Sequence, residues 1–226
     1  MSVALAQRPK FRKSATLLPR ILSAVILIPL ALGIIYIGPP YSLVLGGIIS
    51  AGLFIEWTIL CLKIFLPPWS KLLIVVLGTA YMIVATLWLL HLLFQPEGWK
   101  LLYWLLFLVW STDTASYVGG RLLKGPKLAP SISPYKTWAG FFMGIFGGTV
   151  VAYIASFWLL PNVFNVWEII FLILMAQIGD LLESKIKRLS GVKDSSFLIP
   201  GHGGLLDRLD SLLAVAVTIA LWQWLC

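Results

Sequence analysis

The stretch KLLIVVLGTAYMIVATLWLLHLLF, Lys71–Phe94, sets the class of fold for this chain. After Lys71 it holds no Asp, Glu, Lys or Arg, and it is longer than the roughly 20 residues that an α-helix needs to cross a membrane. Further apolar stretches lie on both sides of it, at Ile21–Ile37, Tyr41–Cys61, Trp99–Val118, Trp138–Leu160, Trp167–Leu182 and Leu209–Cys226. The sequence therefore predicts an all-α, polytopic transmembrane helix bundle with about seven spans.

The composition agrees with a chain whose surface faces lipid. Hydrophobic residues make up 60% of the sequence and charged residues only 12%, and the mean hydropathy is +0.95. Soluble domains carry about a quarter charged residues, so this chain has too few to cover a water-facing surface. We expect residues 1–20 to form a basic cytoplasmic tail and residues 21–226 to form a single membrane-embedded domain. The tail and the first apolar stretch are together typical of a retained signal anchor.

The basic residues are distributed unevenly around the apolar stretches. Of the 17 Lys and Arg residues, 16 lie in the tail, in Lys63–Lys71, in Arg121–Lys136 and in Lys185–Arg208, and only Lys100 lies elsewhere. Because the cytoplasmic loops of membrane proteins carry an excess of Lys and Arg, this pattern predicts a cytoplasmic N-terminus. The net charge of +8 thus indicates membrane orientation, and we expect no nucleic-acid partner.

Two expected cytoplasmic loops, about Gly119–Lys136 and about Glu183–Arg208, are longer than a turn requires. The second is bounded by two pairs of carboxylates, Asp180 with Glu183 and Asp207 with Asp210. Residues three apart on a helix share a face, and hard oxygen ligands suit Mg²⁺. Cations suited to polyphosphate lie between the pairs, at Lys185, Lys187, Arg188, Lys193 and Arg208. Metal ligands beside phosphate-binding cations are the groups that phosphoryl transfer requires.

Each of these features has a simpler interpretation when it is taken alone. The basic residues after Glu183 are typical of anchors at the end of a span. The acids of Asp207–Asp210 are favourable at any helix start. Asp180 is different, because a carboxylate so close to a span is costly unless it is hydrated, paired or metal-bound. Glu56 and His91, in or near predicted spans, are interpreted as partners in helix packing.

The order of residues in the second loop resembles a family signature. It runs Ser184-Lys-Ile-Lys-Arg188, then Lys193-Asp194, then Pro200-Gly-His-Gly-Gly-Leu-Leu-Asp-Arg-Leu-Asp210. This pattern is similar to that of the phosphatidate cytidylyltransferase (CDP-diacylglycerol synthase) family. The stretch from Asp113 to Gly119, followed by Ser133-Pro-Tyr-Lys136-Thr137, resembles an upstream segment of the same family. The resemblance covers about residues 113–211.

Two positions depart from the family pattern. Ala139 stands where the family usually has glutamate, and Lys124-Gly125 reverses the usual glycine-lysine order. We assign no role to Ala139.

The resemblance implies that a phosphate oxygen of phosphatidic acid attacks the α-phosphorus of CTP, giving CDP-diacylglycerol and pyrophosphate for phospholipid biosynthesis. It implies Mg²⁺ as cofactor, leaves a second metal ion open, and assigns the metal site to Asp180, Asp207 and Asp210. The expected catalytic residues are Lys193, Asp194, His202 and Arg208. The expected substrate-binding residues are Ser133, Lys136, Thr137, Lys187, Arg188, Gly203 and Gly204, the two glycines because they let backbone amides approach a phosphate.

The resemblance also implies a place and partners for the protein. It points to a multi-pass protein of the bacterial inner membrane whose active site faces the cytoplasm. Its partners would be CTP, phosphatidic acid and membrane lipid, and a homodimer is left open.

Two other functions remain open at this point. A CTP-dependent lipid kinase would need the same groups, but it would release CDP instead of pyrophosphate. A transporter or non-enzymatic membrane scaffold would place its polar residues near mid-membrane between helices, whereas here they gather at one face.

Overall fold

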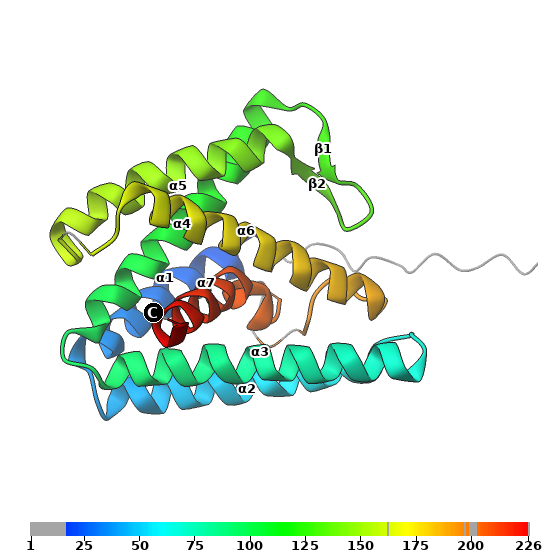
Figure 1. Ribbon diagram of the computed structural model, residues 1–226, viewed down its shortest axis with the longest axis horizontal. Coiled ribbons are helices and arrows are strands. Elements are labelled where there is room, and N and C mark those ends of the chain that lie inside the picture. Colours follow the sequence, from blue (N-terminus) through cyan, green and yellow to red (C-terminus); the bar gives the residue numbers. More distant parts are fainter. Residues whose placement is uncertain (1–16, 162, 197, 199–202, 226) are drawn as a thin grey trace, which may run out of the picture.

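The structure is a computed structural model that describes residues 17–161, 163–196, 198 and 203–225. Within these residues the chain forms seven helices and one β-hairpin (Figure 1). The helices are α1 (Leu17–Ile37), α2 (Tyr41–Lys63), α3 (Pro68–Phe94), α4 (Gly98–Leu123), α5 (Trp138–Leu159), α6 (Val166–Leu189) and α7 (Leu206–Leu225), and the antiparallel strands are β1 (Lys127–Ala129) and β2 (Ser133–Thr137). The all-α fold class is confirmed. Most of the predicted basic tail lies outside the described residues.

Three helices in the described part of the chain, α2, α3 and α5, are long and apolar enough to cross a membrane. Within α1 the apolar part, Val25–Ile37, is shorter than these three helices. The other three helices carry charged side chains near the ends that lead to the long loops. Several membrane helices are therefore confirmed, and the total of about seven spans stays a prediction.

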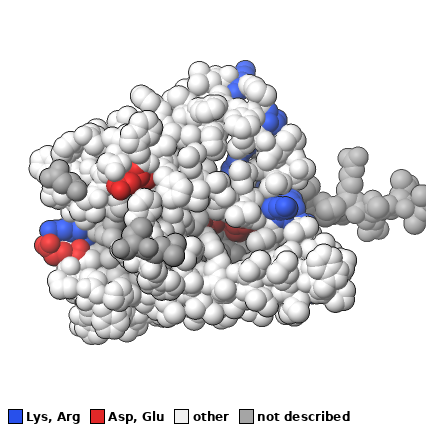
Figure 2. Space-filling view, viewed as in Figure 1, with Lys and Arg blue, Asp and Glu red and all other residues white. Residues whose placement is uncertain are grey.

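The outer surface is largely apolar, as a lipid-facing surface requires. Large hydrophobic side chains stand exposed along the helices, for example Ile48, Leu72 and Phe146. Figure 2 shows one face that is mostly uncharged, with Lys and Arg gathered mainly on the side that carries the hairpin. Because a soluble monomer rarely exposes so much contiguous apolar surface, this face is suited to lipid contact.

α7 lies in the middle of the bundle, where it packs on α3 and α6 (Figure 1). Leu213, Val215, Ala216 and Ala220 on this helix have no exposed surface. α7 therefore takes its position from the surrounding helices, and its first turn, which carries the end of the family-like signature, is held among them.

A seam of small residues joins α4 to α5. On α5 the buried positions recur every four residues, at Gly140, Gly144, Gly148, Ala152 and Ser156. A Cβ atom added at Gly144 would lie 2.0 Å from Ser116 Oγ, and one added at Gly148 would lie 2.3 Å from Thr112 Oγ1. Small residues at this spacing let two membrane helices approach closely. The seam thereby fixes the half of α4 that carries Asp113.

The two ends of α6 are set by different means. Asn165 and Glu168 form a capping box at its start, in which the Asn165 side chain accepts from the Glu168 amide and the Glu168 carboxylate accepts from the Asn165 amide. At its other end the helix continues to Leu189, seven residues beyond the predicted apolar stretch. These extra turns carry the basic side chains of the signature.

Candidate active site

The candidate site lies where the last turns of α6, the first turn of α7 and the hairpin meet. The Ser190 hydroxyl on the C-terminal side of α6 donates to Leu60 O of α2. Arg188 donates from Nε to Ile132 O in the hairpin and from Nη1 to Val192 O, with both distances 3.1 Å. The two loops predicted to carry the chemistry are therefore in direct contact.

Lys187 occupies the centre of a buried ion-pair network. Its Nζ lies 2.7 Å from Asp207 Oδ1 and also pairs with Glu183, and all three side chains are about one-tenth exposed or less. The sequence predicted that Lys187 contacts substrate phosphate. In the described structure its charge is already matched by two carboxylates that link α6 to α7.

The electrostatics of this network follow from burial and charge. Burial raises the pKa of Glu183 to about 7, although the Lys187 ammonium acts in the opposite direction. Burial alone would lower the pKa of Lys187, but Glu183 and Asp207 hold it above its usual range. Burial works against ionisation of Asp207 as well, yet Lys187 and the backbone amides of Gly204 and Ser195 keep its pKa below the usual range. Lys187 and Asp207 are thus charged at neutral pH.

Asp207 also closes the loop between α6 and α7. Its Oδ2 accepts hydrogen bonds from the amides of Ser195 and Gly204, at 2.9 and 2.8 Å. A Cβ atom at Gly204 would lie 1.8 Å from Ser195 Oγ, so only glycine fits there. Gly203 has φ of +90°, a backbone conformation that favours glycine. These two glycines, predicted to approach a phosphate, have structural reasons to be glycine.

Glu56 is the site residue whose role the sequence did not indicate. It is 2% exposed and accepts four hydrogen bonds, from the hydroxyls of Ser195 and Ser196 and from the amides of Leu205 and Leu206. The interpretation as a packing partner was correct in that the side chain is buried and paired. Its partners lie 139 or more residues further along the chain, so no local pattern could reveal them.

A second ion pair connects the hairpin to α6. Lys136 Nζ lies 2.5 Å from Asp180 Oδ2, and both side chains are about three-tenths exposed. This pair joins a predicted phosphate-binding residue to a predicted metal ligand. Thr137 beside it is buried and caps α5, since its Oγ1 accepts from the Gly140 amide.

Three carboxylates from three helices approach one another in the same region. Asp113 of α4 and Asp180 of α6 lie near enough to Asp210 of α7 for their charges to repel its charge. Asp210 accepts a hydrogen bond from the Ser211 amide, at 2.7 Å. Among the described residues, no three His, Cys, Asp or Glu side chains lie in an arrangement that could hold a metal ion as it stands.

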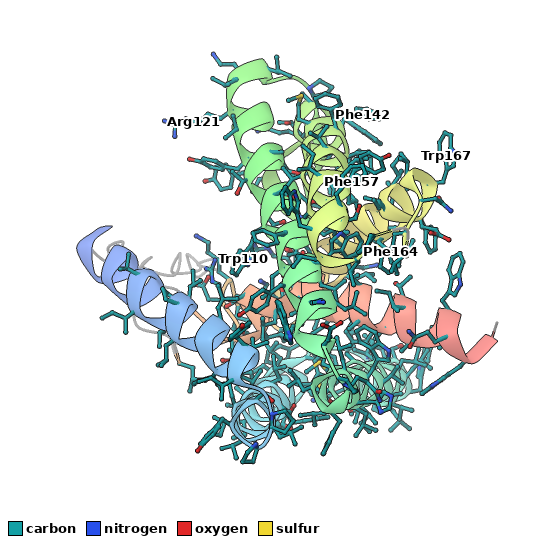
Figure 3. The ribbon with its side chains drawn as sticks, turned by 90° about the vertical axis from the view of Figure 1, so that its left-hand side faces the viewer. Trp110, Arg121, Phe142, Phe157, Phe164 and Trp167 are labelled. Carbon is teal, nitrogen blue, oxygen red and sulfur yellow. The ribbon has the colours of Figure 1, made fainter. Side chains whose placement is uncertain are left out.

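A cavity of about 600 Å³ reaches Asp113 and Asp210 from the apolar part of the bundle. Apolar side chains of α1, α2, α3 and α4 line most of it, and Trp110 does so from the side of α4 that faces α1 (Figure 3). Its charged lining comes from α4 and from the first turn of α7, at Asp113, Asp207, Arg208 and Asp210. The cavity is therefore apolar along most of its walls and carries three carboxylates and one guanidinium at one end.

The remaining predicted residues are placed as follows. Lys193 and Asp194 are exposed on the loop after α6, Arg208 is exposed on the first turn of α7, and Ser133 is half-buried at the start of β2. His202 lies outside the described residues. Their predicted roles in catalysis and substrate binding stay predictions.

Comparison of the sequence with known proteins shows the family of the chain. The family model described as the cytidylyltransferase family matches residues 60–226, which include both loops of the candidate site. The chain belongs to this cytidylyltransferase family. The family prediction made from the signature is therefore confirmed.

Other members of the cytidylyltransferase family are similar over different shares of the chain. A phosphatidate cytidylyltransferase of Rickettsia conorii is 31% identical over 95% of this chain and 94% of its own length. One of Rickettsia felis is 34% identical over 87% of this chain and 88% of its own length. One of Brucella suis is 45% identical over 57% of this chain, and the chain spans about half of that relative, 48%.

Proposed function

We propose that this member of the cytidylyltransferase family transfers a cytidylyl group from CTP to phosphatidic acid, giving CDP-diacylglycerol and pyrophosphate. The observation that carries the proposal is the cavity, because its apolar walls meet Asp113, Arg208 and Asp210 at the signature loop. Acyl chains suit the apolar walls, and at the charged end Arg208 suits a phosphate head group, while the carboxylates there would need a bound cation to accept one. The names of the relatives support the same reaction.

In the proposed reaction a phosphate oxygen of phosphatidic acid forms a bond to the α-phosphorus of CTP. The bond between that phosphorus and the oxygen bridging to the β-phosphate breaks, and pyrophosphate leaves with the electron pair. The nucleophile is already an anion, so no strong protein base is required. The protein must bring two polyanions together and neutralise their charge, which exposed cations such as Lys193, Arg208 and Arg188 would do.

The carboxylates of the site have the donor chemistry that a divalent cation requires. Asp180 and Asp210, together with Asp113, supply hard oxygen ligands from three helices, and Asp180 also pairs with Lys136. Since the described side chains form no ready-made metal site, we propose that these three would reorient to hold Mg²⁺, which when bound would neutralise phosphate charge. Both oxygens of Asp207 accept from protein donors, so we propose that Asp207 holds the loop. Its predicted role as a metal ligand, and a second metal ion, stay predictions.

Phosphate binding would change the pairing of Lys136. In the absence of substrate its ammonium is neutralised by Asp180. If Asp180 held a cation, Lys136 would be available to a phosphate of CTP or of the lipid. The pair is partly exposed, so little free energy is needed to separate it.

We propose that the protein lies in the bacterial inner membrane and that its site faces the cytoplasm. The contacts of Ser190 with α2 and of Arg188 with the hairpin support this orientation, because they bring three of the basic segments to one end of the bundle. Lys100, the basic residue outside these segments, lies in the first turn of α4 and pairs with Glu97 just before that helix. A homodimer stays a prediction.

Incubation of the purified protein with phosphatidic acid, Mg²⁺ and CTP labelled at the α-phosphate tests the function. We expect the label to enter the extracted lipid and pyrophosphate to be released in equal amount. Label that enters lipid only from the γ-phosphate would show a CTP-dependent lipid kinase. No transfer from either position would contradict both enzymes and favour a transporter or scaffold.

A further inference from the structure

Glu56 is a buried carboxylate that the proposed reaction does not use. It lies on α2, which is apolar enough to cross a membrane, and it falls outside residues 60–226 matched by the family model. A charged group in such a helix is costly unless its partners compensate fully. The question is therefore what the chain gains by keeping a carboxylate there.

The four donors match the four acceptor positions of an ionised carboxylate. Oε1 accepts from the Ser196 hydroxyl and, at 2.8 Å, from the Leu205 amide. Oε2 accepts from the Ser195 hydroxyl at 2.9 Å and from the Leu206 amide at 2.8 Å. An ionised carboxylate has no proton to donate and about four lone-pair positions, so this arrangement satisfies it completely.

These donors come from two parts of one loop. Ser195 and Ser196 lie six and seven residues after the end of α6, and Leu205 and Leu206 lie where the loop enters α7. One side chain of α2 therefore holds the two parts together. Its negative charge also lies at the N-terminus of α7, where the helix dipole favours it.

The contact extends from Glu56 to the ion-pair network. The Ser195 hydroxyl lies 2.9 Å from Glu56 Oε2 and 3.1 Å from Asp207 Oδ2, so its one proton is shared between two carboxylates. Asp207 in turn pairs with Lys187 of α6. The start of α7, which carries Arg208 and Asp210, is thus fixed both to α2 and to α6.

We propose that Glu56 is a positioning residue for the transfer reaction: it fixes the first turn of α7 relative to α6, and its loss lowers turnover more than it lowers stability. The proposal rests on the proposed function for its kinetic consequence. Displacement of reacting groups by about 1 Å typically costs about a hundredfold in rate. The effect of Glu56 would therefore appear in kcat, although the side chain touches no substrate.

The Glu56→Gln variant is the sharpest test, because the amide has nearly the same shape. Glutamine keeps one oxygen and replaces the other by an NH₂ group, which donates. Either Leu205 N–H or Leu206 N–H then faces another donor, whichever way the amide turns. Glu168→Gln is a matched control, since Glu168 also caps a helix start and glutamine serves equally well in a capping box.

We expect Glu56→Gln to lower kcat about a hundredfold per folded protein, with Glu168→Gln within about threefold of the parent. Ser196→Ala removes one of four donors and should lower kcat only a few-fold, and Glu56→Asp should lie between. Cleavage by a lysine-specific protease at the exposed Lys193 should accelerate in Glu56→Gln. Thermal unfolding in detergent defines the temperature range in which each variant is folded.

Parental kcat in folded Glu56→Gln would overturn the proposal. So would a lower unfolding temperature of this variant if its kcat, measured at temperatures where it is folded, equals that of the parent. If Glu56→Gln does not fold, Glu56→Asp and Ser196→Ala decide, and parental kcat in both would overturn it. If the parent transfers no cytidylyl group, the proposed function fails independently. Unchanged cleavage at Lys193 would then still contradict the positioning role.

Discussion

At the scale of single residues, Asp207 and Asp210 are three positions apart yet have different surroundings. Asp207 accepts from Lys187, Ser195 and Gly204, whereas Asp210 faces the charges of Asp113 and Asp180. From the sequence we predicted that both would be metal ligands. Spacing on a helix shows which side chains share a face, but it does not show which of them has its oxygens occupied by the rest of the fold.

The Asp210→Asn and Asp207→Asn variants should therefore behave differently. Loss of a metal ligand at 210 should lower turnover by about a thousandfold and change the unfolding temperature little. Asp207→Asn breaks a buried ion pair, which typically costs about 3–5 kcal/mol of stability, so both turnover and unfolding temperature should fall. Turnover across a Mg²⁺ titration and thermal unfolding in detergent check this. Turnover of Asp210→Asn within tenfold of the parent at every Mg²⁺ concentration would contradict the metal role.

The raised pKa of Glu183 predicts how the stability of the fold depends on pH. Its pKa is raised from 4.5 to about 7 in the folded protein, so between these values the folded state binds more protons than the unfolded state. Stability should therefore decrease as pH rises through this window. Glu183→Gln removes the titrating group and should flatten the decrease. Thermal unfolding between about pH 4.5 and 8 measures it, and an unchanged slope in Glu183→Gln would contradict the assignment.

At the scale of elements, the apolar pattern predicted helices well where lipid exposure sets their length. The predicted stretch Tyr41–Cys61 became α2, Tyr41–Lys63, and Lys71–Phe94 became α3, Pro68–Phe94. The stretch Trp167–Leu182 ended too early, because hydropathy reports what faces lipid and the charged turns of α6 continue beyond it. The hairpin was treated as a loop, since its five-residue strand has half-buried and exposed positions and no clear alternation.

The seam between α4 and α5 gives a prediction at this scale. A Cβ atom at Gly144 would clash with Ser116 Oγ, so Gly144→Ala should separate the helices, lower the unfolding temperature and displace Asp113. Gly47→Ala on α2 is the matched control, because a Cβ atom there meets nothing within 4 Å. Since alanine favours helices over glycine by about 1 kcal/mol, the control should be neutral or more stable. Equal unfolding temperatures in the two variants would contradict a tight seam.

At the scale of the whole molecule, the proposed orientation is tested by labelling from outside the cell. Single cysteines at Ser131 and Gln95, both exposed, are introduced after Cys61 and Cys226 are replaced by serine. An impermeant thiol reagent should label Gln95→Cys in intact cells and Ser131→Cys only after the membrane is opened. Labelling of Ser131→Cys but not of Gln95→Cys in intact cells would show the opposite orientation. The uneven distribution of Lys and Arg predicted this arrangement, because charge bias acts on topology directly.

The contact of Arg188 with both loops has a consequence for how the molecule could be altered. One guanidinium bonds to Ile132 O in the hairpin and to Val192 O after α6, although these residues are far apart in the chain. Substitutions in the two loops should then be epistatic, because groups that share a partner do not act independently. A hairpin taken from a relative should fit poorly unless the loop after α6 is taken from the same relative. We therefore expect the two loops to change together in evolution.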